Sequence, residues 1–127
     1  MKKYDTSRLL AEGYNIENAV IDRVDLSMAD HGVLDMSVVV KGYGWGCSLG
    51  GYVIGKGYLG AKEFEGFAKG TESIMRIMDV VGVDHFSMLK GKHVRVASKG
   101  WGSRIKIIGN IIKDKWFDYE SFFADAD

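Results

Sequence analysis

Two stretches in the first half of the chain, residues 20–28 and 34–41, alternate between apolar and polar positions. A period of two is typical of a β-strand with one buried face. In the first stretch we expect one face to hold Val20, Asp22, Val24, Leu26 and Met28. The sequence between the stretches, Asp30-His31-Gly32, is typical of a turn. The two strands are therefore expected to form an antiparallel hairpin.

Three further strands are expected. One covers residues 45–54, where glycines at 46, 50 and 51 indicate bulges or a ligand lying against the backbone. The other two, at 94–97 and 105–111, follow from the same apolar and polar alternation. Residues 55–66 are interrupted by glycines and are expected to form a loop.

Apolar residues recur at steps of three and four between Phe67 and Val81, which is typical of an amphipathic helix. Gly82 follows the last of them and is expected to end this helix as its C-cap. Residues 118–123 are expected to form a short C-terminal helix whose aromatic side chains need burial, against this subunit or another.

Together these elements predict an α+β fold. We expect a twisted antiparallel sheet of about five strands, with the 67–82 helix packed on one face and the short C-terminal helix beside it. Residues 1–15 are expected to be a polar N-terminal lead-in, and residues 16–127 a single domain.

Composition excludes several classes of partner. The 17 Lys and Arg residues balance 17 Asp and Glu residues, so no net charge draws the chain to long nucleic acid or to an anionic membrane. No apolar run approaches the ~20 residues of a membrane span. Cys47 is the single cysteine and cannot form an internal disulfide, which favours the reducing cytoplasm.

Two strings look catalytic, and both lack the required context. Residues 46–50 fit a nucleophile elbow around Ser48, but the sequence continues as strand where an elbow needs a helix. Residues 55–60 fit a dinucleotide fingerprint, but no βαβ unit surrounds them. The loop could still offer backbone N–H groups to a phosphate.

The sequence does not favour a metal site or a reactive thiol either. The three histidines, His31, His85 and His93, have no second ligand at metal spacing. Cys47 has no cation or histidine next to it in sequence that would activate its thiol. We therefore expect a binding protein with no catalytic residue, metal or cofactor.

Glycine recurs beside flat aromatic residues in 42–46 and 100–102, and a Trp-Phe pair stands at 116–117. A ring that stands clear of the backbone can stack on a nucleobase, although most tryptophans fill a core or an interface. Lys99, Arg104 and Lys106 near Trp101 favour a phosphorylated aromatic ligand. Residues 16–127 are accordingly expected to form a ligand-binding domain.

The order of several motifs resembles a known family of small phage and prophage proteins. The motifs are DHGVL (30–34), GWGC (44–47), GGY (50–52), GT (70–71) before IMRI (74–77), VGVD (81–84), LKGK (89–92), VRV (94–96), GWG (100–102) and IIGNIIKDKWF (107–117). This order is similar to that of the first Thoeris anti-defence family, and the resemblance spans residues 16–123. Residues 55–70 depart from the family pattern.

The resemblance implies a sponge in the cytoplasm of the bacterial host. Such a protein binds and sequesters a cyclic ADP-ribose isomer, and in some members cyclic trinucleotides, without cleaving them. It also implies dimers that can group into hexamers, with pockets near subunit contacts. The pocket candidates that it implies are Trp45, Arg76, Trp101, Arg104 and Asn110, to which the charge pattern adds Lys99.

Two other functions remain open from the sequence. The chain could be a protein-binding phage inhibitor or a small structural phage protein whose aromatic residues lie in an interface. A nucleotide hydrolase would need a positioned base or a metal, which the sequence does not provide. Self-association is expected in any case, because a sheet and one helix have difficulty covering Trp116, Phe117, Phe122 and Phe123.

Overall fold

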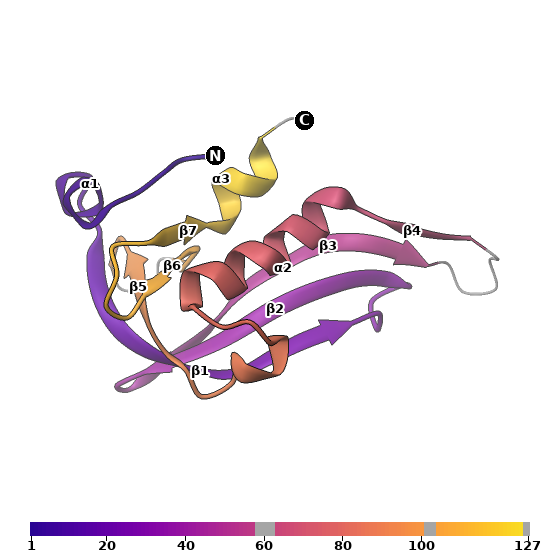
Figure 1. Ribbon diagram of the computed structural model, residues 1–127, viewed down its shortest axis with the longest axis horizontal. Coiled ribbons are helices and arrows are strands. Elements are labelled where there is room, and N and C mark those ends of the chain that lie inside the picture. Colours follow the sequence, from indigo (N-terminus) through magenta and orange to yellow (C-terminus); the bar gives the residue numbers. More distant parts are fainter. Residues whose placement is uncertain (58–62, 101–103, 126–127) are drawn as a thin grey trace.

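A computed structural model of the chain describes residues 1–57, 63–100 and 104–125. Within them, seven strands form one antiparallel sheet in the order β4-β3-β2-β1-β5-β6-β7, accompanied by helices (Figure 1). The elements are α1 (Thr6–Ala11), β1 (Asn15–Ser27), β2 (Val33–Gly42), β3 (Trp45–Gly57), β4 (Phe64–Gly66), α2 (Ala68–Val81), the 3-10 turn η1 (Phe86–Met88), β5 (His93–Ser98), β6 (Ile107–Asn110), β7 (Trp116–Asp118) and α3 (Tyr119–Ala124).

The α+β class and the antiparallel sheet are confirmed, but the expected strand number is too small. The two additional strands are β4 and β7, which have three residues each. Such a segment is too short to display the alternation by which a strand is recognised in sequence. The fold therefore contains seven strands where about five were expected.

The expected faces of β1 are wrong for its first half. Ala19 and Ile21 are buried, whereas Val20 is only half-buried. The pairing of β1 with β2 shifts between Ile21 and Arg23, which is the mark of a β-bulge. One extra residue in a strand exchanges the faces on which the following side chains lie. Val24 therefore packs against the core as expected, whereas before the bulge Ile21 and not Val20 lies in the core.

Helix α2 confirms the main helix. Its buried side chains, Ser73, Ile77 and Val80, follow the helical period, and it ends at Gly82, whose φ of 91° is the left-handed conformation of a glycine C-cap. At its start, Gly70 lies directly against Ile54 of β3, so close that a Cβ on Gly70 would stand 2.3 Å from the Cβ of Ile54. This close approach fixes the distance between helix and sheet.

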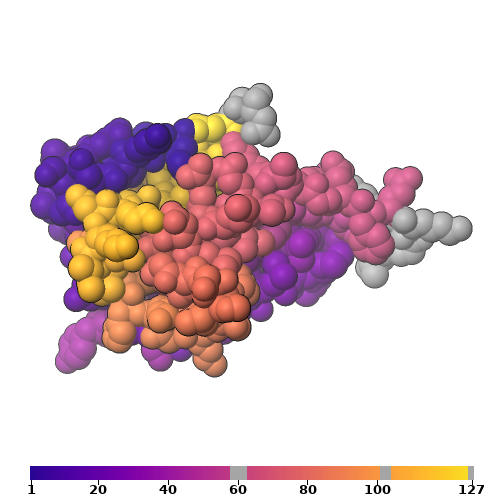
Figure 2. Space-filling view, in the orientation of Figure 1, coloured from indigo at the N-terminus to yellow at the C-terminus, as the bar shows by residue number. Residues whose placement is uncertain are grey.

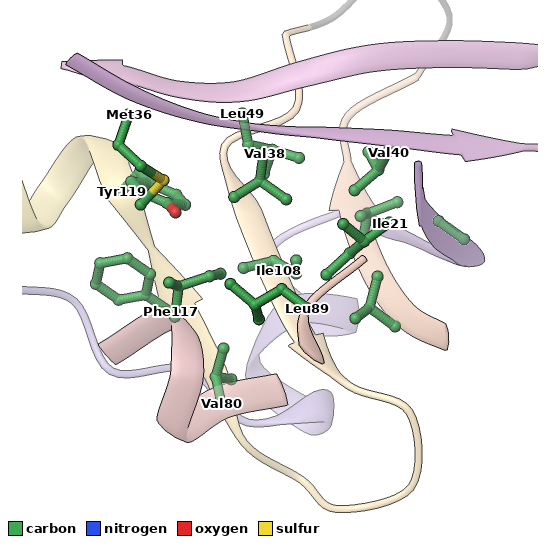
Figure 3. Packing of buried hydrophobic residues seen from close by; sticks show 14 of the residues in the cluster. Ile21, Met36, Val38, Val40, Leu49, Val80, Leu89, Ile108, Phe117 and Tyr119 are labelled. Atoms are coloured by element: carbon green, nitrogen blue, oxygen red, sulfur yellow. The ribbon is translucent and has the colours of Figure 1, made fainter. Parts of the chain in front are cut away.

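The main core lies between one face of the sheet and helices α2 and α3. Figure 3 shows side chains of β1, β2 and β3 meeting those of α2, β6 and the β7–α3 segment. Tyr119 is 1% exposed, and its hydroxyl has no hydrogen-bond partner within the described residues. Burial raises the pKa of Tyr119, which therefore stays neutral under ordinary conditions.

A second cluster covers the other face of β5 and β6. It joins the buried side chains of Tyr4, Leu9 and Tyr14 to Ala97 and Ile107, the strand neighbours of two residues that belong to the main core. Neighbouring residues in a strand point to opposite faces, so the two clusters lie on opposite sides of the sheet. The segment expected to be a polar lead-in thus contains α1 and packs on the sheet.

The ends of the hairpin strands extend past the region that the helices cover. Figures 1 and 2 show α2, α3 and the N-terminal segment grouped over the body of the sheet, while the far ends of β1–β4 form a narrower projection. None of the helices in the described ranges is long and apolar enough to cross a membrane. The candidate site lies where the projection meets the body, between the end of β3, β4, the start of α2, and α3.

Candidate functional site

Two of the three tryptophans each cover a glycine of the neighbouring strand with one side of the ring. Trp45 pairs across the hairpin with Gly42, and its ring carbons lie 2.3–2.4 Å from the position that a Cβ on Gly42 would occupy. Trp116 covers Gly109 in the same manner. An aromatic ring laid over a cross-strand glycine replaces the packing that the glycine lacks. The ring of Trp45 therefore lies against the backbone and does not stand clear of it.

Asn110 has a structural role. Its side-chain amide donates to the backbone oxygens of Val80 at 3.0 Å and Val81 at 3.3 Å, and its Oδ1 accepts from the N–H groups of Ile112 at 2.9 Å and Lys113 at 2.8 Å. These four contacts use both donors and both lone pairs of the amide. We therefore assign Asn110 to the junction between the end of α2 and the loop after β6.

The remaining candidates divide into two groups. The ammonium of Lys99 lies 4.7 Å from the ring centroid of Tyr14, in the second cluster on the far face of the sheet. Trp101 lies outside the described residues. Arg76 and Arg104, in contrast, both contact aromatic rings that belong to or pack against the main core.

Arg76 and Arg104 stand at the two ends of one chain of aromatic rings. The Arg104 guanidinium lies 5.9 Å from the Tyr52 centroid, and Tyr52 stacks on Phe123 with a centroid distance of 4.3 Å and an interplanar angle of 11°. Phe123 meets Phe122 at 5.1 Å, and the Arg76 guanidinium lies 5.5 Å from the Phe122 centroid. Lys69 also approaches Phe122, at 5.2 Å. We call these six residues the cation–aromatic cluster.

A groove of about 430 Å³ adjoins the cation–aromatic cluster and shares Lys69 and Phe123 with it. The larger side chains that line it are Val53, Glu65, Phe67, Lys69 and Phe123. It lies between the end of β3, the short strand β4, the first turn of α2 and α3. Its volume falls within the range of about 300–1,000 Å³ that small-molecule sites occupy.

The charges of the cluster are held in place by neighbours. The Nε of Arg76 donates to the carboxylate of Glu72, one helical turn earlier, at 2.6 Å. Partial burial raises the pKa of Tyr52, against the opposing influence of the Arg104 charge, so its hydroxyl remains a neutral donor. The cluster thus combines neutral rings with cations, which suits a planar ligand that carries negative charge.

A larger groove, of about 730 Å³, lies on the other side of α3, against the N-terminal segment. Two of its cations have acidic partners, as Arg76 does in the smaller site: Arg8 pairs with Glu12 at 2.7 Å and Lys106 with Glu120 at 3.2 Å. None of the described residues that line this groove is aromatic, so they offer no stacking surface. We therefore place the candidate site in the smaller groove beside the cation–aromatic cluster.

Where the structure describes the two catalytic-looking strings, their residues do not form the sites that the motifs require. Ser48 lies within β3, which continues to Gly57 and does not turn into a helix after it, and burial raises the pKa of the neighbouring Cys47 thiol. The fingerprint-like stretch 55–60 runs from the end of β3 into residues outside the described part of the chain. Among the described residues, no three His, Cys, Asp or Glu side chains lie together as a metal site would require.

Sequence analysis missed four of the six residues of the cation–aromatic cluster: Tyr52, Lys69, Phe122 and Phe123. Tyr52 follows Gly50 and Gly51, which have φ values of 88° and 77° and form a bulge that turns the Tyr52 side chain toward the core. Phe122 and Phe123 were noticed only as apolar residues in need of burial. Their role depends on α3 lying against β3, a contact between segments about 70 residues apart that no local pattern predicts.

Comparison with protein-family models, with curated proteins and with solved structures gave no match to this chain.

Proposed function

We propose that this chain binds a phosphorylated ligand with a planar ring and holds it without chemical change. The observation that carries the proposal is the cation–aromatic cluster beside the 430 Å³ groove. A ring can stack on Phe123, which lines the groove, and the guanidinium groups of Arg76 and Arg104, which belong to the adjoining cluster, can donate hydrogen bonds to phosphate oxygens. Two of the sequence-predicted residues thus support the proposal.

The specific ligand that we propose is a nucleotide immune signal, a cyclic ADP-ribose isomer, with cyclic trinucleotides as a second class. This choice rests on the resemblance in motif order to the first Thoeris anti-defence family. The protein would then be a phage anti-defence sponge that acts in the host cytoplasm. A ligand of about 35 heavy atoms at ~0.3 kcal/mol each reaches about 10 kcal/mol, or a dissociation constant of tens of nanomolar.

Sequestration fits the site better than hydrolysis does. The candidate nucleophiles Ser48 and Cys47 lie within β3 and outside the groove lining. The described residues that line the groove include one carboxylate and no histidine or cysteine, so they offer no nucleophile paired with a base. A protein that captures its ligand stoichiometrically needs no such pair.

The proposal predicts binding without turnover. In calorimetric titration with a cyclic ADP-ribose isomer, Arg104→Ala should weaken binding by about tenfold to a hundredfold, because a charge-assisted hydrogen bond contributes about 1.5 to 3 kcal/mol. Trp101→Ala is expected to weaken it to a similar degree by loss of stacking. Heating the complex and analysing the released ligand by mass spectrometry should return it unchanged.

Arg23→Ala is the matched control, since Arg23 is an exposed arginine of β1 with one weak ion pair to Asp22 at 3.9 Å. Its variant should bind as the wild type does. Wild-type affinity in both Trp101→Ala and Arg104→Ala would show that the pocket lies elsewhere. Recovery of a hydrolysed product would make the protein an enzyme.

One observation favours a protein-binding phage inhibitor as a second candidate. At the projecting end of the strands, Met28 Cε and Phe64 Cδ1 lie 2.7 and 2.8 Å from the position of a Cβ on Gly57, so the two side chains meet over this glycine. Phe64 is nevertheless 79% exposed. Exposed apolar side chains that gather at one place are typical of a protein contact.

Self-association is also part of the proposal, but part of the aromatic residues from which the sequence predicted it are buried in the single chain. Phe117 and Phe122 are buried within the single chain and need no second subunit. The most exposed large apolar side chains among the described residues, which a second copy could cover, are instead Tyr43, Phe64 and Ile112. Light scattering at micromolar concentration should give at least a dimer mass, and a monomer mass would contradict the prediction.

A further inference from the structure

Among the described residues, Glu65 is the one carboxylate that lines the candidate groove, and it does not pair with the lysine that stands opposite it. On β4 it stands directly across from Lys56 of β3. Opposite charges in such cross-strand positions commonly pair. No ion pair or hydrogen bond joins these two side chains, and within the described residues Glu65 has no other partner.

The structure shows where the lysine goes instead. The ammonium of Lys56 lies 5.7 Å from the ring centroid of Phe67, the residue that precedes α2 and lines the same groove. This distance is typical of a cation–π contact. Lys56 thus contacts the Phe67 ring and does not pair with Glu65, so the carboxylate oxygens of Glu65 remain available to accept hydrogen bonds from a ligand.

The groove consequently has positive charge at one side and negative charge at the other. The cation–aromatic cluster lies at the side of Lys69 and Phe123, while the carboxylate of Glu65 lies at the side of β4. The other lining residues of the first turn of α2 and the end of β4 are small, namely Gly66, Ala68 and Gly70. A ligand can therefore lie between the two sides without displacing a bulky side chain.

We infer that Glu65 selects the sugar of the ligand by accepting hydrogen bonds from the vicinal hydroxyls of the adenosine ribose, an inference that rests on the proposed function. The two oxygens of a carboxylate can accept from two adjacent hydroxyl groups, and the negative charge strengthens both bonds. A phosphate in the same position would bring two negative charges together and would be repelled. The site should thus take ribosyl ligands with free hydroxyls and reject those phosphorylated at this position.

The test compares two probes, ADP-ribose and ADP-ribose 2′-phosphate, by calorimetric titration. The wild type should prefer ADP-ribose by about tenfold or more, because a charge-assisted hydrogen bond is replaced by repulsion. Glu65→Gln keeps the shape of the side chain and removes its charge. This variant should bind ADP-ribose more weakly, because the charge that strengthens the hydrogen bonds is lost. It should also reduce the preference for ADP-ribose to about threefold or less, because the repulsion of the phosphate is lost as well.

Glu63→Gln is the matched control, because Glu63 is exposed, lies two residues away and does not line the groove. This variant should keep the wild-type preference. Equal wild-type affinity for the two probes, no binding of either probe, or an unchanged preference in Glu65→Gln would overturn the inference. Titration with the cyclic ADP-ribose isomer tests the proposed function separately, so failure of that titration is distinguished from failure of the role of Glu65.

Discussion

Replacing Gly70 by alanine is expected to destabilise the protein by about 2 to 3 kcal/mol, the cost of forcing an extra methyl group into a well-packed contact. The new Cβ would lie 2.3 Å from Ile54 Cβ, 2.7 Å from Ile54 Cα and 2.8 Å from the Ile54 oxygen. Two of these atoms belong to the backbone of β3 and cannot turn away. The helix must therefore move outward from the sheet.

The sign of this effect is what makes it informative. In a helix interior, alanine is otherwise more favourable than glycine by about 1 kcal/mol. Gly66→Ala is the control, since Gly66 has a negative φ and a Cβ there would meet nothing within 4 Å. Urea denaturation should show a large loss for Gly70→Ala and little change for Gly66→Ala. Equal stability of Gly70→Ala and the wild type would mean that α2 does not sit on Ile54 as described.

The ligand should report the same movement. Gly70 lines the candidate groove, and its first-turn neighbour Lys69 belongs to the cation–aromatic cluster. An outward shift of α2 separates the groove wall from Phe123 on α3. We therefore expect Gly70→Ala to bind the ligand more weakly even at temperatures where the variant is folded.

The sequence predicts those parts of the fold that have a regular period over many residues. The 67–82 helix and its glycine C-cap, the hairpin of β1 and β2 and the strand at 94–97 are present as expected. Strand β6 is different, because Ile107 and Ile108 both are buried, one in each cluster. A strand that is buried on both faces lacks the alternation of apolar and polar residues. The sequence of β6 therefore does not reveal that the N-terminal segment packs on its second face.

The site could be predicted only in part, for a similar reason. A cation at position 76 or 104 is visible in the sequence, but the rings that it contacts come from β3 and α3. The glycine and tryptophan pattern that suggested stacking surfaces has a local cause in cross-strand pairs such as Gly42 with Trp45. Local pattern and ligand contact give the same sequence signal, and only tertiary structure separates them.

Asn110→Ala is expected to destabilise the protein by about 3 kcal/mol, because it leaves partly buried backbone groups at both ends of the amide without partners. The groups are the oxygens of Val80 and Val81 and the N–H groups of Ile112 and Lys113. Thermal denaturation measures the loss. If Asn110 is structural, the folded variant should keep the wild-type affinity for the cyclic ADP-ribose isomer, whereas a loss of affinity would return Asn110 to the pocket.

Asn110→Asp separates the two ends of the amide. A carboxylate can still accept from the N–H groups of Ile112 and Lys113, but it presents an oxygen in place of the donor to the carbonyls of Val80 and Val81. The charged form is therefore disfavoured in the folded protein, and the pKa of the new carboxyl should be higher folded than unfolded. Destabilisation should be fully present above the folded pKa and should decrease as the pH falls through it, since the protonated carboxyl regains a donor. Denaturation curves of Asn110→Asp and of Asn110→Ala across pH 4 to 8 measure the loss of stability of each variant relative to the wild type. This loss should become smaller at low pH only for Asn110→Asp. A loss of stability that is independent of pH in both variants would show that the donor contacts to α2 contribute little.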